Sequence, residues 1–238
     1  FYNVKPNIKF LIMKKLIIIL LISMWSLDIL AQRDYEAPGA KATVRTHKNF
    51  AIIPFKFIIT AKKPKKMTQE EFEKNTENAE RDGRTSCQSA FAARILKKMS
   101  KGKIAAQLQP VARTNALLSR AEISQTAGDV DTYLPEELCE ILGVDAVIIG
   151  SVESAKLMST GLAVGLKVAS KFVPGLGRIS SGKSSADLAL YDTEGQLLWN
   201  WGTRDLKTSD IGSNTDELID YLMKRATKKF PYFQKVKK

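Results

Sequence analysis

The chain contains little of the chemistry that metal sites and disulfide frameworks require. Its 238 residues include two cysteines, Cys87 and Cys139, and one histidine, His47. Zinc sites use several Cys and His ligands, and disulfide-rich domains need more cysteines, so we expect neither. Glycine and proline, at 14 and 8 residues, are not enriched, which excludes collagen and low-complexity disorder.

Acidic residues are outnumbered. The 25 Asp and Glu against 37 Lys and Arg give a net charge of +12, of which residues 32–238 keep +9. A chain this basic is attracted to anionic surfaces, but its charge alone does not name a partner. Hydrophobic residues make up 44% of the chain and charged residues 26%, as in a globular protein rather than a polytopic membrane protein.

The amino-terminal segment has the order of a secretory signal peptide. We set residues 1–12 aside as an upstream extension, because Met13 is the better start. Two lysines, an apolar run of 12 uncharged residues and the small residue Ala31 follow. This order predicts a signal peptide over 13–31 and a soluble protein exported to the periplasm or outer envelope. The alternative, a transmembrane anchor, needs about 20 apolar residues.

The remaining chain predicts one α/β domain over 42–232, between a flexible lead-in over 32–41 and a basic tail over 233–238. Hydrophobic periodicity, caps and turn residues predict strands over 43–60, 103–111, 144–152, 187–192 and 196–203, and helices over 68–100, 114–118, 135–142 and 213–230. Thr68 with Glu71 matches a capping box, Gly83 interrupts the first helix, and Thr114 is the expected cap of the second. Pro135 and Gly143 mark the start and the end of the third helix, and the apolar run that follows indicates a central strand. We expect a mixed sheet of about five strands, covered by the long helix, the short helices and the carboxyl-terminal helix.

Motifs with catalytic potential have simpler interpretations. Residues 177–184 match the letters of a phosphate loop, but no strand is expected before them and no helix after them. His47 has no nucleophile elbow to serve. The carboxylates near predicted strand ends are common turn residues; they are Asp187, Asp192, Glu194 and Asp205. We therefore predict no catalytic, cofactor-binding or metal-binding residue, no cofactor and no enzymatic activity.

Several features leave two interpretations open. Cys87 and Cys139 form a disulfide or are two separately buried thiols. Trp199 and Trp201 share one strand face and form a partner surface or part of the core. The amphipathic stretch 158–173 contacts a membrane or partner, or packs on the sheet. A basic loop is a candidate anion patch or a solvated turn; it contains Lys62, Lys63, Lys65 and Lys66.

Four segments together suggest a family. They are NFAIIPF at 49–55, PEELCEILGVDAVIIGSV at 135–152, the hairpin ADLALYDTEGQLLWNWGTRD, and the last helix ending in KKFPY. Over residues 42–232 the chain resembles the TolB amino-terminal-like and curli-secretion (CsgG-like) group, including uncharacterised secreted relatives in Gram-negative envelopes. The resemblance implies a periplasmic α/β domain that works by protein contacts in envelope assembly or secretion, and it implies no catalytic residue.

These observations predict an exported, non-enzymatic envelope protein that acts through protein–protein contacts as an assembly or secretion accessory. One alternative is a binding module for an anionic envelope polymer, lipopolysaccharide or cell-wall glycan, that uses the basic loop and the lysine-rich carboxyl end. A membrane surface is a further candidate partner, and a hydrolase is the second alternative. We do not expect a nucleic-acid partner, because an exported basic protein meets envelope polymers first. The oligomeric state is left open.

Overall fold

The computed structural model describes residues 34–60, 63, 65, 67–123, 130–154, 183–207 and 215–233. Several predictions lie outside these residues: the upstream extension, the signal peptide, Lys62, Lys66, the stretch 158–173, residues 177–182 of the phosphate-loop match, and the tail after Phe233. None of the helices in the described part combines the length and the hydrophobicity that crossing a bilayer requires.

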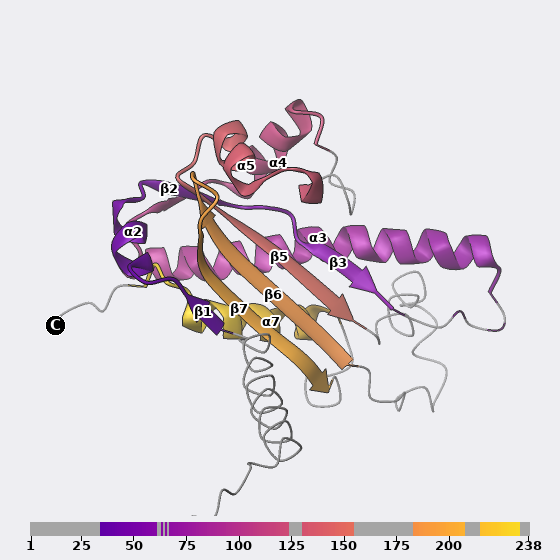
Figure 1. Cartoon of the computed structure of the whole chain (residues 1–238). Helices are drawn as coiled ribbons and strands as arrows, with labels where there is room; N and C mark the ends of the chain where they lie inside the picture. The colour runs from indigo at the N-terminus through magenta and orange to yellow at the C-terminus, as the bar shows by residue number, and fades with distance from the viewer. Residues whose placement is uncertain are drawn as a thin grey trace, which may run out of the picture. The chain divides into compact units, whose positions relative to one another are not determined.

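A mixed sheet organises the described part of the chain (Figure 1). Its seven strands are β1 (Asp34–Glu36), β2 (Asn49–Ile52), β3 (Lys56–Ile59), β4 (Gln107–Leu108), β5 (Ala146–Ser154), β6 (Lys183–Asp192) and β7 (Leu197–Lys207). Their order is β1-β7-β6-β5-β2-β4, and β3 also pairs with β5. The predicted α/β class with a mixed sheet is confirmed, with seven strands instead of about five.

Strand β5 is the centre of the sheet. It pairs in parallel with β2 at Val147 and Ile148 and with β3 from Ser151 to Ser154. On its other edge it pairs antiparallel with β6 along its whole length. The first half of β5 is buried on both faces, which explains the apolar run that predicted a central strand.

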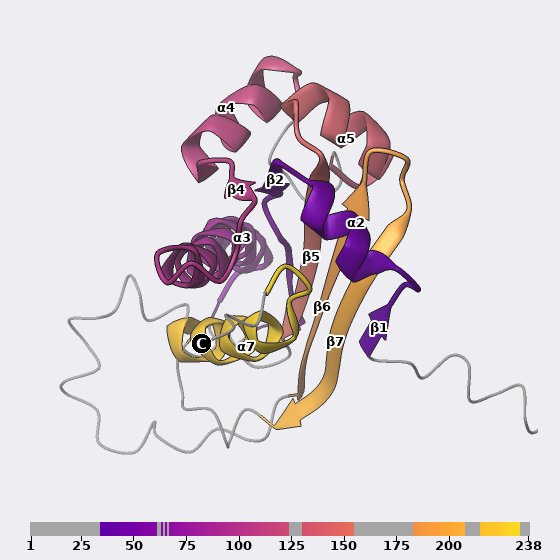
Figure 2. The same cartoon turned by 90° about the vertical axis from the view of Figure 1, so that its left-hand side faces the viewer.

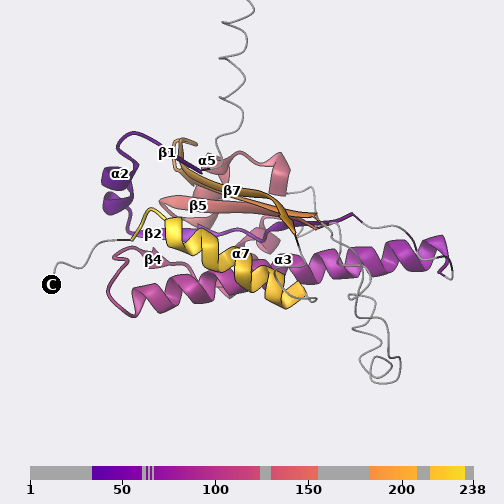
Figure 3. The ribbon, with the colours of Figure 1, turned by 90° about the horizontal axis from the view of Figure 1, so that it is seen from below.

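One face of the sheet is covered by two helices, α3 (Gln69–Met99) and α7 (Thr215–Lys229), which lie side by side (Figures 2 and 3). Thr68 and Glu71 form the predicted capping box at the start of α3, with hydrogen bonds of 3.2 and 3.0 Å. Gly83 does not interrupt the helix; instead, a Cβ there would lie 2.6 Å from the Phe57 ring. The glycine lets α3 approach β3 closely.

Among the described residues, the other face is covered at one end, by α4 (Val111–Arg120) and α5 (Pro135–Leu142), with a short 3-10 turn, η2 (Val130–Thr132), between them (Figure 1). As predicted, α5 begins at a proline and ends at Gly143, whose φ of 64° is left-handed. A second hydrophobic cluster lies under these helices; it contains Ala51, Ile53, Leu118, Leu138, Leu142 and Val147.

Four local predictions are wrong. Residues Ala40–Thr46, expected to lie partly in a strand, form helix α2, which buries Ala40 and Val44. The expected flexible lead-in contains β1, which pairs antiparallel with β7. The strand expected over 103–111 is only Gln107–Leu108. Thr114 does not cap a helix, because α4 begins at Val111 and buries Thr114.

Candidate interaction surfaces

A cluster of aromatic rings fixes the position of the segment that follows α7. Phe230, directly after α7, makes edge contacts with Phe91 of α3 and Trp199 of β7, with ring centroids 5.7 Å apart in each pair. Tyr232 stacks on Phe50 of β2 at 4.6 Å. These contacts place the carboxyl ends of α3 and α7 beside α2 at one end of the sheet (Figure 3).

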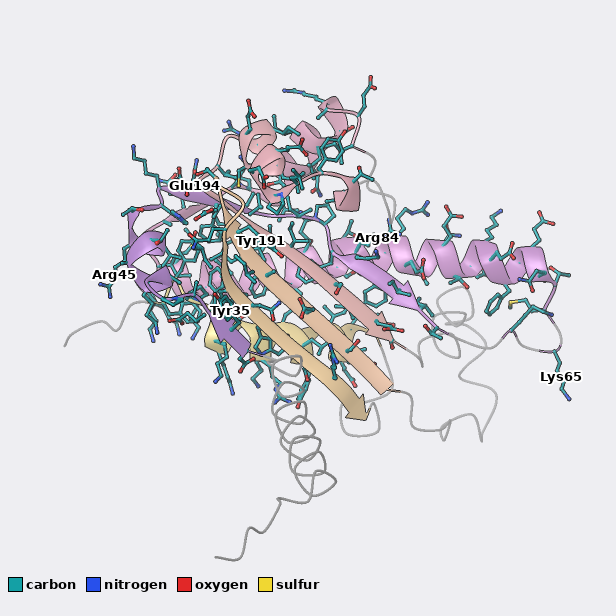
Figure 4. The ribbon with its side chains drawn as sticks, in the orientation of Figure 1. Tyr35, Arg45, Lys65, Arg84, Tyr191 and Glu194 are labelled. Atoms are coloured by element: carbon teal, nitrogen blue, oxygen red, sulfur yellow. The ribbon has the colours of Figure 1, made fainter. Side chains whose placement is uncertain are left out.

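Basic side chains gather at this end of the sheet, which we call the basic end. Lys41 and Arg45 of α2 line a small hollow together with Tyr232 and Phe233. The ammonium of Lys98 lies 5.3 Å from the centroid of the Phe233 ring. The basic end comprises Lys41, Arg45, Lys97, Lys98, Lys101, Lys103, Lys228 and Lys229. Figure 4 labels Arg45 at this position.

Acidic side chains offset only part of this charge. Lys41 pairs with Glu36 at 3.0 Å, and Lys229 lies 3.8 Å from Asp34. Both pairs are solvent-exposed, and exposed ion pairs hold their partners weakly. Lys97, Lys101 and Lys228 are exposed, so the basic end presents positive charge to solvent from three separate elements.

A polar network lies behind the basic end. His47 Nδ1 and the Tyr232 hydroxyl are hydrogen-bonded at 2.6 Å. Burial lowers the pKa of His47, and the carboxylates of Asp145 and Asp192 raise it to a smaller extent. Burial also raises the pKa of Tyr232. His47 is thus held neutral against a neutral tyrosine, and this pair joins α2 to the end of the chain.

Asp145 ties the start of β2 to the end of α5. Its carboxylate accepts the backbone N–H groups of Lys48 at 2.6 Å and Asn49 at 2.9 Å. The Asn49 side chain donates to the carbonyl of Gly143 at 3.2 Å and accepts the backbone N–H of Asp145 at 3.0 Å. This reciprocal set satisfies both side chains within the fold.

An acidic hollow opens beside this clamp. It is lined mainly by Lys48, Asn49, Glu136, Glu137, Cys139, Glu140, Asp145 and Thr193. The nearby Asp192 accepts the backbone N–H groups of Glu194 and Gln196, at 3.0 and 2.9 Å, and so holds the β6–β7 turn. Across the described residues, no three His, Cys, Asp or Glu side chains are grouped so that they could hold a metal ion.

The half of the second sheet face that α4 and α5 leave uncovered is called here the open face (Figure 4). Its polar centre is the hydrogen bond of 2.8 Å from Asn200 of β7 to Asp187 of β6. Tyr35 lies opposite Asn200 in register, and Ile58 of β3 is 37% exposed. With Tyr191 at its margin towards α5, these five residues define the open face.

Electrostatics on the open face follow from partial burial. Burial raises the pKa of Asp187, against the hydrogen bond from Asn200 and the charge of Arg204, which lower it. The pKa of Tyr191 is raised by burial and by the charge of Asp187. The carboxylate and the amide already share a hydrogen bond, yet Asp187 stays exposed and retains acceptor capacity for a partner.

Both cysteines are free, buried thiols, so the candidate disulfide is absent from the structure. Cys87 lies in the main core between the sheet and α3, whereas Cys139 lies in the cluster under α4 and α5. Burial raises the pKa of both thiols, to about 12 for Cys139. The alternative of two separately buried thiols describes them.

The candidate partner surface at Trp199 and Trp201 is also corrected. The two residues are only 3% and 4% exposed and belong to the main core, because their shared face of β7 meets α7 and the Phe230 ring. In the basic loop, Lys63 and Lys65 are exposed, and Lys63 donates to the carbonyl of Met67 at 2.8 Å. They lie just before the start of α3, whereas the basic end lies at the carboxyl end of that helix.

The other predicted candidates do not converge. Asp187 lies on the open face, whereas Asp192 and Glu194 lie at the β6–β7 turn, and the Asp205 side chain falls outside the described residues. Sequence reasoning missed Lys41, Arg45 and Lys98 as members of one surface. A signal was present, since Arg45, Lys98 and Lys229 each fall in the last turn of a helix.

No protein-family model and no curated protein matches the chain. Among solved structures, it is similar to the lipoprotein GNA1162 from Neisseria meningitidis, with 15% identity over 76% of this chain and 94% of that chain, and a TM-score of 0.41. The PelC dodecamer from Paraburkholderia phytofirmans matches with 12% identity over 85% and 97% of the two chains, at 0.37. The LpoB C-terminal domain from Salmonella enterica matches with 9% identity over 69% and 93%, at 0.29. Likenesses this weak carry no argument about function.

Proposed function

We propose that this chain is an exported, non-enzymatic protein of the cell envelope that acts through contacts with another protein. The observation that carries the proposal is the open face. The other face of the same sheet is buried under α3 and α7, whereas here Ile58 is 37% exposed and Tyr35 and Tyr191 are only half-buried. No described helix covers this region.

The composition of the open face suits a protein partner. Tyrosine and arginine are enriched at the centres of protein interfaces, and here Tyr35, Tyr191 and Arg204 surround the Asp187–Asn200 hydrogen bond. The aromatic rings offer contact area, and the polar pair offers directional hydrogen bonding. A partner that covers Ile58 would also remove its apolar surface from water.

The ionisable groups outside the open face support a role in binding rather than in catalysis. Asp145 and Asp192 each hold two backbone N–H groups, and His47 is bonded to Tyr232. Each of these side chains has a positioning task within the fold. This arrangement supports a role in which the domain presents surfaces and does not transform a substrate.

Site-specific photocrosslinking in intact cells tests the proposal. A photoreactive residue at Ile58 should yield a covalent product with one other envelope protein. The matched control is the same residue at Lys74, which is exposed on the polar half of α3. If Ile58 recovers only the protein itself, or if Lys74 recovers the same protein in equal yield, the proposal is wrong.

A second variant sharpens the result. Replacing Ile58 with Glu places a charge on the open face at an exposed position and leaves the buried face of β3 unchanged. We expect it to reduce crosslinking from a photoreactive residue at Ser151 by at least tenfold, with unchanged thermal unfolding. An unchanged yield from Ser151 would show that the partner does not cover this face.

A further inference from the structure

We propose that the basic end seats the domain on an anionic lipid bilayer. This surface lies outside the open face, so the inference goes beyond the contact with a protein partner. Eight basic residues lie there, on α2, in the last turns of α3 and α7 and in the turn that follows α3, and two acidic residues, Asp34 and Glu36, pair with part of them. A leaflet rich in anionic lipid attracts such clusters.

Separate elements, far apart in sequence, are held in this cluster by the fold. Lys98 lies over the Phe233 ring, and Phe233 lines one hollow with Lys41 and Arg45. The backbone N–H groups of Lys101 and Lys103 both donate to the carbonyl of Lys98, at 3.2 and 3.1 Å, which turns the chain after α3 back across this end. The charges therefore share one surface.

Helix dipoles explain part of the cluster but not all of it. Lysines in the last turns of α3 and α7 favourably meet the negative ends of these helices. Lys101 and Lys103 lie beyond α3, and Lys41 lies in the first turn of α2, where a dipole disfavours a positive charge. The positive charge of these three residues is therefore not explained by the helix dipoles.

The shape of the basic end favours a surface over a single bound ion. The hollow beside Phe233 is small, and most of the basic side chains around it are exposed. Such an array can meet many phosphates that lie in one plane. Phe233 is half-buried among the lysines, and an aromatic ring with basic neighbours is suited to the level of lipid headgroups.

The test compares two triple variants of the full chain in vesicle flotation. The first, Arg45→Gln, Lys101→Gln and Lys228→Gln, removes one exposed charge from α2, one from the turn after α3 and one from α7. The control, Lys65→Gln, Lys74→Gln and Arg81→Gln, removes the same charge near the other end of α3. That helix has 31 residues and is about 46 Å long, several screening lengths at physiological salt.

Vesicles of phosphatidylcholine, with or without one third phosphatidylglycerol, serve as the membrane. Each basic residue near an anionic surface strengthens binding about fivefold, so the first variant should bind anionic vesicles roughly a hundredfold more weakly. The control should stay within about threefold of the unaltered chain, because its charges lie beyond the screening length. Every variant keeps the same amino-terminal segment, so binding through that segment contributes equally to all of them and does not affect the difference between the two triple variants.

Two outcomes overturn the inference. Equal losses in both triple variants would mean that net charge, and not the basic end, governs binding. The second outcome is that the unaltered chain is retained on immobilised heparin, an anionic polysaccharide, but does not float with anionic vesicles. That result would assign the basic end to a polymer. Neither result depends on Ile58 crosslinking, so failure here and failure of the proposed protein contact are distinguishable.

Discussion

The two faces of the sheet are built from the same strands but have different roles. On the face covered by α3 and α7, called here the closed face, Phe230 contacts rings from β2, α3 and β7, so three distant parts of the chain meet at one residue. On the open face, Asp187 and Asn200 bond only across neighbouring strands. The closed face holds the fold together, whereas the open face leaves side chains available for contact.

Removing the ring at the centre of the aromatic cluster should have the largest effect. Phe230→Ala deletes a side chain that is 2% exposed and contacts five aromatic rings, so we expect the free energy of unfolding to fall by about 3–5 kcal/mol. Urea denaturation measures it. Phe233→Ala, at the half-buried edge of the cluster, is the control and should cost clearly less; equal losses would contradict a centre at Phe230.

Two adjacent isoleucines test the comparison within one strand. Ile59 faces the closed face at 9% exposure, and Ile58 faces the open face at 37%. We expect Ile59→Ala to cost about 2–4 kcal/mol and Ile58→Ala less than about 1 kcal/mol, because only the former leaves a cavity. Equal costs in urea denaturation would show that Ile58 is packed as tightly as Ile59.

A methyl group at Gly83 probes how closely α3 lies on the closed face. Alanine favours helix by about 1 kcal/mol over glycine, but its Cβ would lie 2.6 Å from the buried Phe57 ring. Since overpacking costs about 1–3 kcal/mol and the helix preference offsets about 1 kcal/mol, we expect Gly83→Ala to destabilise the fold by up to about 2 kcal/mol. Combining it with Phe57→Leu should cost less than the sum of the two changes; simple additivity would contradict the close approach.

The smallest expected effect concerns the junction behind the basic end. Because the pKa of His47 is lowered by burial, the unfolded chain binds a proton there more readily than the folded chain once the pH falls below about 6.5. Stability should therefore decrease as the pH falls from about 7.5 to about 5, and less so in His47→Gln. If the urea midpoints of the unaltered chain and of His47→Gln changed equally with pH over this range, burial of a neutral His47 would be contradicted.

Local signals in the sequence were sufficient for the elements that carry their own caps. The capping box at Thr68 and the proline and glycine that bracket α5 predicted both helices correctly. Helix α2 was missed because Thr43, Val44 and Thr46 are β-branched and favour strands, and only the burial of Ala40 and Val44 in the main core overrides this preference. Strand β1 was missed because its pairing partner lies in β7, far along the chain.

The surfaces were less predictable than the elements. The two-residue period placed Trp199 and Trp201 on one face correctly, but it does not say whether that face is covered; α7 and Phe230 decide this. The basic end joins Lys41 to Lys229, and no local pattern spans that distance. Such a surface becomes visible only when the packing of Phe230 and Tyr232 is known.

The pairing of β1 with β7 sets an order of events as well as a structure. Strand β1 opens the domain, yet its partner is the penultimate element, and His47 meets Tyr232 across 185 residues. A chain that emerges from its amino terminus therefore cannot close its sheet until nearly all of it is present. Until β7 has emerged, the backbone groups of β1 have no partner strand, and another chain can pair with them. Protection of this edge against aggregation therefore comes late in folding, when β1 and β7 pair.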